Sequence, residues 1–131
     1  MTATVSRQTK YAAIVIDALA EQTHATNAEL LEVAQRAYPE VSATTIHRVT
    51  ARLKERGLIG CAPKTMSGAE RYDIRTDPHH HFMCQACGAV CDMPDTDELG
   101  SILRKLQTLS EECELAGMMT LQGVCKKCTK K

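Results

Sequence analysis

The sequence predicts an α+β fold made of two domains, and three features of the chain lead to this prediction. Three stretches with a helical spacing of apolar residues come first, a hairpin pattern follows them, and short strands around two pairs of cysteines complete the chain. A length of 131 residues is sufficient for two small domains. We expect the first domain over residues 1–75, a hinge at residues 76–78, and the second domain over residues 79–131.

The first domain is predicted to begin with three helices, because apolar residues recur at every third or fourth position. Asn27 is expected to cap the second helix and Ser42 the third, while Pro39 ends the second helix. Gly57 occupies the position just after the third helix, where glycine is favoured. These helices are predicted over residues 8–20, 27–38 and 42–56.

A β-hairpin is predicted next, with strands at residues 58–62 and 71–74 and a turn near Ser67-Gly68. Three helices followed by a hairpin are typical of a winged helix-turn-helix domain, whose third helix enters the major groove of DNA. The alternative is a small helical domain with an ordinary charged helix face. Residues 43–64 hold five basic residues and one acidic residue, a patch that suits nucleic acid although the whole chain carries 16 basic and 16 acidic residues. The DNA-binding candidates on the outer side of the third helix are Thr44, Thr45, His47, Arg48 and Arg52.

The second domain is predicted to contain three strands and one helix. The first two strands lie on either side of a turn at Cys87-Gly88, and the helix carries a row of leucine and isoleucine side chains on one side. The strands are predicted over residues 79–84, 89–93 and 118–122, and the helix over residues 96–113.

Four cysteines in two C-x-x-C pairs predict a structural zinc site. Each pair holds two thiolates close enough for one tetrahedral Zn²⁺, and two pairs with matched spacing complete the coordination. A closed site of this kind is structural, because no coordination position stays open. A redox dithiol or a disulfide is the alternative. The four expected ligands are Cys84, Cys87, Cys125 and Cys128.

The remaining cysteines, Cys61, Cys91 and Cys113, are expected to be small buried hydrophobic residues. A thiol redox switch that uses one of them is the alternative. No apolar run approaches the roughly 20 residues of a membrane span, and the N-terminus lacks a signal-peptide pattern. We therefore expect a cytoplasmic protein without a membrane partner, in a compartment where thiols stay reduced and paired cysteines more often hold metal.

Three consecutive histidines at the start of the second domain predict a second metal site. Side chains alternate along a strand, so His79 and His81 are expected to point to one side and His80 to the other. Cys84 favours the side opposite His81, because it lies three positions, an odd step, further along the strand. One side of the sheet is then available for a histidine pair and the other for the zinc site.

Two carboxylates and one more histidine are expected to join this pair, with His24 placed in the turn between the first two helices. Three imidazoles and two carboxylates without a thiolate suit Fe²⁺, Mn²⁺ or another first-row dication. Solvent-facing strand histidines are one alternative, and a catalytic metal site is another, although no nucleophile or general base accompanies it. The candidate ligands are His24, Asp73, His79, His81 and Asp92.

With these motifs the chain resembles the ferric uptake regulator family of metal-dependent repressors over nearly its whole length. Residues 77–92, DPHHHFMCQACGAVCD, are similar to the family's H-H-x-H-x-x-C-x-x-C-G signature, and residues 123–128 are similar to its closing G-x-C-x-x-C. Residues 42–49 resemble its recognition helix, with His47 in place of the usual tyrosine. The family's second exchangeable metal site uses a histidine at the position of Gly117, so we expect no such site.

The resemblance implies a winged-helix domain, a small α/β dimerisation domain, a homodimer and a Cys₄ structural zinc. It also implies a regulatory Fe²⁺ or Mn²⁺ at the hinge, held by the five His and Asp ligands named above. The two aspartates are most like the peroxide-sensing branch, in which Fe²⁺ causes oxidation of a ligating histidine, here His24 or His81. We therefore expect a non-enzymatic, metal-dependent repressor of double-stranded operator DNA that responds to peroxide. The alternative is an iron, manganese or zinc homeostasis repressor without peroxide sensing.

Overall fold

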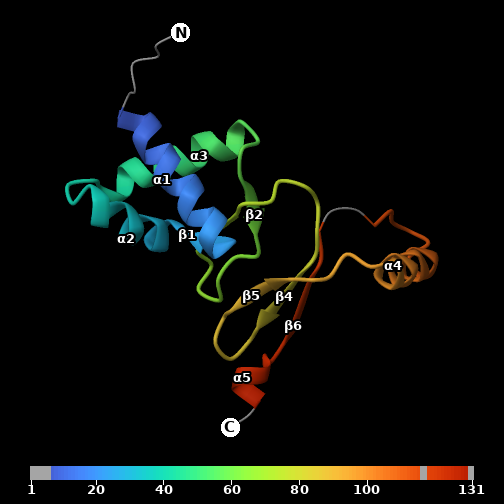
Figure 1. The fold of residues 1–131 in the computed structure, drawn as a ribbon. Coiled ribbons are helices and arrows are strands. Elements are labelled where there is room, and N and C mark those ends of the chain that lie inside the picture. Colours follow the sequence, from blue (N-terminus) through green and yellow to red (C-terminus); the bar gives the residue numbers. More distant parts are fainter. Residues whose placement is uncertain (1–6, 116–117, 130–131) are drawn as a thin grey trace. The chain divides into compact units, whose positions relative to one another are not determined.

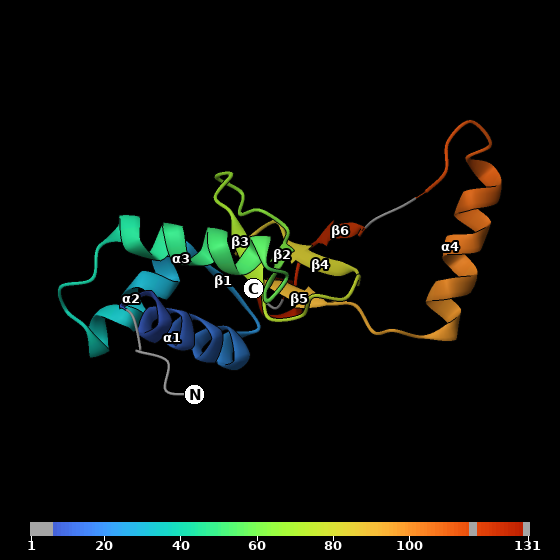
Figure 2. The ribbon, with the colours of Figure 1, turned by 90° about the horizontal axis from the view of Figure 1, so that it is seen from above.

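The computed structural model describes residues 7–115 and 118–129, and the chain divides into two compact units. Unit 1 is Met1–Asp77 and unit 2 is Pro78–Lys131. In the described residues, each unit contains one three-stranded sheet together with helices (Figures 1 and 2). The α+β class predicted from the sequence is confirmed. No helix among residues 7–115 and 118–129 has the length and apolar character needed to cross a membrane.

Unit 1 packs three helices against one another around an apolar core, in which Val15, Leu19, Leu30 and Ile46 are completely buried. Its small antiparallel sheet has the strand order β1-β3-β2. The elements of unit 1 are α1 (Arg7–Gln22), β1 (His24–Thr26), α2 (Asn27–Ala37), α3 (Ala43–Glu55), β2 (Gly60–Ala62) and β3 (Arg71–Asp73).

Strand β1 corrects the expectation that His24 lies in a turn. The segment pairs with β3, and His24 lies directly opposite Asp73 in that register. Thr23 ends α1 with a φ of +70°, a left-handed conformation that is unfavourable for a β-branched residue. Its amide donates to Leu19 O and its carbonyl accepts from Ile74 N–H, so the surrounding bonds hold this turn in place.

The N-terminus of α2 also differs from the prediction, because Thr26 caps the helix and Asn27 does not. Thr26 Oγ1 accepts from Glu29 N–H, and Glu29 Oε1 accepts from Thr26 N–H, which together form a capping box. The Asn27 side chain accepts instead from Thr50 Oγ1 at 2.7 Å and ties α2 to α3. Threonine is also a favoured N-cap residue, so Thr26, directly before Asn27, could have been recognised as the cap from the sequence.

Helix α3 begins and ends as predicted. Ser42 Oγ accepts from Thr45 N–H at the N-terminus, and Gly57 adopts a φ of +71° just after the C-terminus. The buried side of the helix consists of Ile46, Val49, Thr50 and Leu53.

Unit 2 has the strand order β5-β4-β6, with β4 antiparallel to β5 and parallel to β6. His81 on β4 lies opposite Asp92 on β5. The elements of unit 2 are β4 (His81–Cys84), β5 (Val90–Asp92), α4 (Asp97–Leu109), β6 (Thr120–Gly123) and α5 (Lys126–Thr129).

Three elements of unit 2 depart from the prediction. The first strand starts at His81, two residues later than expected, and the short helix α5 was not predicted. Helix α4 ends four residues early because Ser110 caps it, with its amide donating to Leu106 O and Gln107 O. The Gln107 side chain then donates to Cys113 O and accepts from Leu115 N–H, which holds the chain in a turn after the helix.

Candidate metal centres

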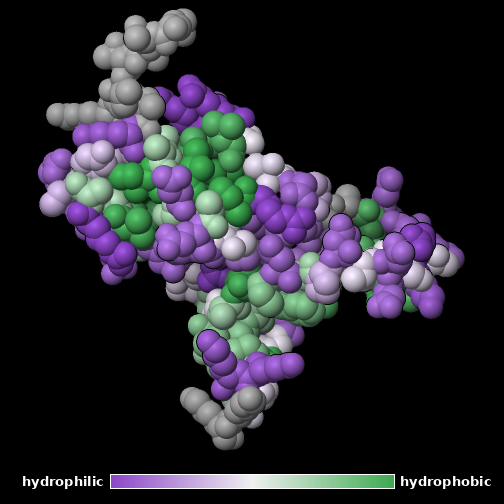
Figure 3. Space-filling model, in the orientation of Figure 1, coloured by the Kyte–Doolittle hydropathy of each residue, from purple (hydrophilic) through white to green (hydrophobic). Residues whose placement is uncertain are grey.

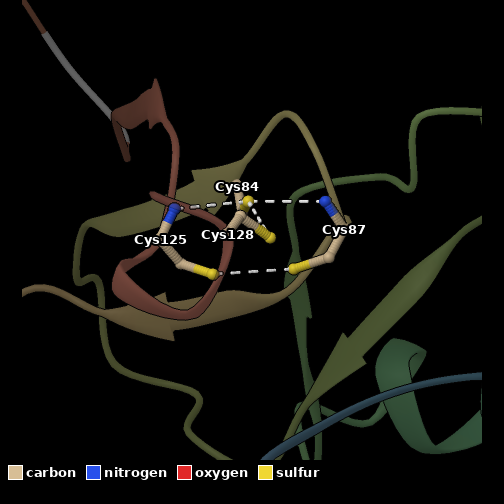
Figure 4. Close-up of side chains that lie close together, drawn as sticks. All are labelled: Cys84, Cys87, Cys125 and Cys128. Atoms are coloured by element: carbon tan, nitrogen blue, oxygen red, sulfur yellow. Dashed lines mark hydrogen bonds between the residues drawn. The ribbon is translucent and has the colours of Figure 1, made fainter. Parts of the chain in front are cut away.

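The four paired cysteines form one cluster in unit 2, as the sequence predicts. Cys84 ends β4, Cys87 lies in the following turn, and Cys125 and Cys128 flank the start of α5. Their sulfur atoms face one another (Figure 4), and all four lie within 4.8 Å of each other. The glycine that follows Cys87 has a φ of +78°, which lets the chain turn back into β5.

The sulfur spacing fits a tetrahedral zinc ion. Four sulfurs bound at about 2.3 Å from one Zn²⁺ lie about 3.8 Å apart along each edge of the tetrahedron. The Cys84–Cys128 and Cys87–Cys125 sulfur distances are both 3.8 Å. A disulfide needs about 2.05 Å between its sulfurs, so this arrangement fits metal binding and not a bonded pair.

Backbone hydrogen bonds prepare Cys84 to bind metal as a thiolate. The amides of Cys125 and Cys87 donate to its sulfur at 3.3 Å and 3.4 Å, and this lowers the pKa of Cys84 from 9.0 to about 6. The pKa of Cys128 is raised to about 12, chiefly through its hydrogen bonds with the neighbouring Cys125 and Cys84 sulfurs. Cys84 therefore loses its proton near pH 6, whereas Cys128 keeps its proton up to about pH 12.

A second group of potential metal ligands lies around the start of β4 and the end of β5. His79 Nε2 is 3.2 Å and His81 Nε2 is 3.5 Å from the same oxygen, Asp92 Oδ1. The two imidazole rings are tilted by 53° with centroids 4.4 Å apart, and both side chains are buried. Ligand atoms about 2.1 Å from an octahedral ion lie about 3 Å apart, so three donor atoms are already close to coordinating positions.

Unit 1 presents a comparable pair of side chains. His24 Nε2 is 3.3 Å from Asp73 Oδ2, and the other carboxylate oxygen accepts from Arg75 N–H at 2.9 Å. Asp73 is completely buried, and a buried carboxylate is stable only when it is paired. Gly60 lies opposite Asp73 on β2, and a Cβ there would meet the Arg75 carbonyl oxygen at 2.4 Å, so this position requires glycine. The requirement for glycine at 60 was not visible in the sequence.

His80 has a structural contact that the sequence analysis did not find. Its Nδ1 accepts from Met119 N–H at 2.9 Å, and its backbone carbonyl accepts from Met93 N–H. These bonds fix the segment before β4 against the chain on both sides, which explains why His80 lies apart from the pair formed by His79 and His81. Gly117 lies outside the described residues.

The DNA-binding candidates lie on α3 as expected, with one difference. Thr44, His47, Arg48 and Arg52 are exposed. Thr45 is half-buried, and its hydroxyl group is 3.1 Å from Ser42 Oγ within the N-terminal cap. Thr45 therefore contributes to the start of the helix as well as to its outer surface.

The prediction that the three other cysteines are buried is wrong. Cys91 and Cys113 are exposed, and Cys61 is half-buried. Cys91 alternates with Val90 and Asp92 along β5, so its side chain points away from the histidine pair. The strand is short and lies at the edge of its sheet, which left no covered position for this residue.

Comparisons with known proteins agree with this architecture. The model of the ferric uptake regulator family matches residues 3–116. The peroxide-responsive repressor PerR of Staphylococcus aureus (strain USA300) is 27% identical over 116 residues, which cover 86% of this chain and 75% of that protein.

Two solved structures show the same fold. The Helicobacter pylori ferric uptake regulator has a TM-score of 0.76 and 19% identity, covering 93% of this chain and 81% of that one. The Campylobacter jejuni peroxide stress regulator has a TM-score of 0.72 and 24% identity, covering 93% of this chain and 91% of that one.

Proposed function

Because the chain belongs to the ferric uptake regulator family, we propose that it represses transcription by binding operator DNA when a first-row dication joins its two units. Members of this family are metal-dependent transcriptional regulators and not enzymes, so the catalytic-metal alternative is set aside. The observation that carries the proposal is the presence of buried or half-buried His and Asp donors in each unit, with two imidazole nitrogens of unit 2 directed at one carboxylate oxygen.

The regulatory metal is assigned to ligands from both units. His79, His81 and Asp92 form one set and His24 and Asp73 the other, and either set alone would leave three or four positions of an octahedral ion to water. These nitrogen and oxygen donors suit Fe²⁺ or Mn²⁺, while the four thiolates of the cysteine cluster suit Zn²⁺. We therefore assign a structural Zn²⁺ to the four cysteines of unit 2 and a regulatory Fe²⁺ or Mn²⁺ to the five His and Asp ligands.

Regulation follows from the position of the shared ligands. A metal that needs donors from both units binds more tightly when the units adopt one particular arrangement, so it shifts the population toward that arrangement. The difference in metal affinity between arrangements is the coupling free energy available for DNA binding. His24 lies on β1, which follows α1, and Asp73 lies on β3, which pairs with β1 and with the strand β2 that follows α3. This small sheet links metal binding to the helix that we assign to DNA.

A second copy of the chain is the partner that we propose for the uncovered apolar side of unit 2. Helix α4 has no buried residue, and Ile102 and Leu109 on it are 53% and 81% exposed. Phe82 and Leu121 lie side by side in the β4–β6 register and are also exposed. Figure 3 shows apolar colouring over the sheet of this unit. A homodimer would cover these side chains and present two α3 helices to successive turns of the major groove.

We further propose that the regulatory site senses peroxide in the cytoplasm. When bound, Fe²⁺ supplies the reduction of hydrogen peroxide that the side chains cannot perform. In the net reaction one oxygen atom of the peroxide would be inserted at an imidazole C–H bond of His24 or His81. The displaced hydrogen would move to a ring nitrogen, and the other peroxide oxygen would leave as water. The oxidised imidazole would be a poorer ligand, which would lower the affinity for the metal and, through it, the affinity for DNA. Support comes from the two aspartate ligands and from the S. aureus peroxide-responsive relative.

Mass spectrometry of anaerobically Fe²⁺-loaded protein tests this step. After a small excess of peroxide, we expect the peptide with His24 or His81 to gain the mass of one oxygen, and Mn²⁺- and Zn²⁺-loaded controls to stay unchanged. Unmodified histidine peptides with iron demonstrably bound would contradict peroxide sensing. The second candidate function, control of iron, manganese or zinc homeostasis, would then be favoured, because the same nitrogen and oxygen donors bind these ions without oxidation.

A further inference from the structure

A hollow of about 490 Å³ lies in unit 1 beside the N-terminal end of α3. It is open to solvent and lined mainly by polar side chains, which distinguishes it from the apolar cavities that bind small organic molecules. Helix α1, the loop after α2 and the first turns of α3 all contribute to it. The lining residues are Lys10, Tyr11, Glu40, Val41, Ser42, Thr45 and Arg48.

Aromatic rings hold Lys10 at one wall of this hollow. Its Nζ lies 4.1 Å from the ring centroid of Tyr38 and 5.3 Å from that of Tyr11. The two tyrosine rings meet edge to face with centroids 5.4 Å apart, and Tyr11 is 5% exposed, so this support is itself anchored in the core. A flexible lysine is thereby restricted to one place, and less conformational entropy is lost when it binds an anion.

Arg48 supplies a second cation to the lining of the hollow, from the exposed side of α3. Thr45 and Arg48, one helical turn apart, face the hollow, whereas Thr44 and His47 lie on the adjacent exposed row of the helix. The outer surface of α3 therefore has two rows, and only one of them adjoins the hollow.

We propose that this hollow holds a backbone phosphate of duplex DNA between Lys10 and Arg48, and that Thr44 and His47 are left to contact base edges. The proposal rests on the proposed DNA-binding function and assigns separate tasks to the two rows of α3. A phosphate contact fixes the position of a protein on DNA without reading its sequence. Glu40 lines the same hollow and opposes the anion, so the hollow carries two positive charges and one negative charge.

The test uses Mn²⁺-loaded protein with two duplexes, one selected from a random pool by the wild-type protein and one of scrambled sequence. Binding is measured over a series of salt concentrations. Lys10→Gln is expected to weaken binding to both duplexes by the same factor, and to lower the slope of log K against log salt by about 0.9 for each bound protomer. His47→Ala is expected to reduce discrimination between the duplexes instead.

Three further variants sharpen the test. Arg36→Gln removes one positive charge from an exposed position of α2 outside the hollow, and should leave affinity and slope unchanged. Tyr38→Leu should weaken binding to both duplexes less than Lys10→Gln does, because Lys10 keeps its charge and loses only part of its aromatic support. Tyr38→Phe keeps an aromatic face and should bind like the wild type. Glu40→Gln should strengthen binding to both duplexes.

An unchanged salt slope in Lys10→Gln would overturn the proposal, as would a loss confined to the selected duplex. If the wild-type protein binds DNA only with metal while Lys10→Gln keeps the wild-type slope, only the phosphate assignment fails. If the wild-type protein binds no duplex with or without metal, both this assignment and the proposed function fail.

Discussion

Replacement of His81 by alanine is expected to abolish metal-dependent DNA binding while the protein stays folded. The His81 side chain is 1% exposed, and its Nε2 lies 3.5 Å from Asp92 Oδ1. Loss of a residue that only supports a ligand costs about 10–100-fold in metal affinity. If His81 is a direct ligand, as proposed, its removal should therefore weaken Mn²⁺ binding by more than about 100-fold.

Titration calorimetry with Mn²⁺ and fluorescence anisotropy with a selected duplex measure the two effects. His47→Ala is the matched control for metal binding, because it removes an exposed imidazole from another part of the chain. His81→Gln retains much of the side-chain volume and separates ligand loss from the cavity that alanine would leave. Wild-type metal affinity in both His81 variants would exclude His81 as a ligand.

Replacement of Cys84 by serine is expected to remove zinc and the folded structure of unit 2 together. Cys84 is the buried member of the cluster, and its sulfur accepts hydrogen bonds from the amides of Cys87 and Cys125. Structural Zn²⁺ contributes about 10–16 kcal/mol of apparent binding free energy in zinc-finger peptides. This is comparable to the total stability of a small domain, about 5–15 kcal/mol, so the unit should not remain folded without it.

Zinc content by elemental analysis and segment-resolved hydrogen exchange check this result. We expect fast exchange across β4 and β6 in Cys84→Ser, with protection retained in α1 and α3, whose core belongs to unit 1. Cys113→Ser provides the matched control, because Cys113 is an exposed cysteine outside the cluster. A zinc-free Cys84→Ser protein with protected β4 and β6 would show that the cluster is not needed for folding.

The elements that the sequence predicted well are those whose signals are local. Ser42 and Gly57 delimit α3 through the conformation of the adjacent turn, and the spacing of the C-x-x-C pairs depends only on a few neighbouring residues. Both features are therefore visible without any knowledge of tertiary structure.

The elements that were missed depend on distant partners. Strand β1 exists because residues 24–26 pair with β3, far along the chain, and three residues are too few to give a periodic pattern. The early end of α4 depends on the Gln107 side chain, which competes for the following backbone groups although the apolar spacing continues. The exposure of Cys91 depends on the position of β5 at a sheet edge, which sequence spacing does not reveal.

The parallel pairing of β4 with β6 has a consequence for the order in which a newly made chain matures. On the ribosome, unit 1 and the β4–β5 hairpin emerge before residues 120–128, which supply the second neighbour of β4 and the last two zinc ligands. Until then β4 has an open edge and two unpaired thiols, a state prone to aggregation and oxidation. A shortage of zinc should therefore lower the yield of newly made protein before it affects protein that has already folded and bound zinc.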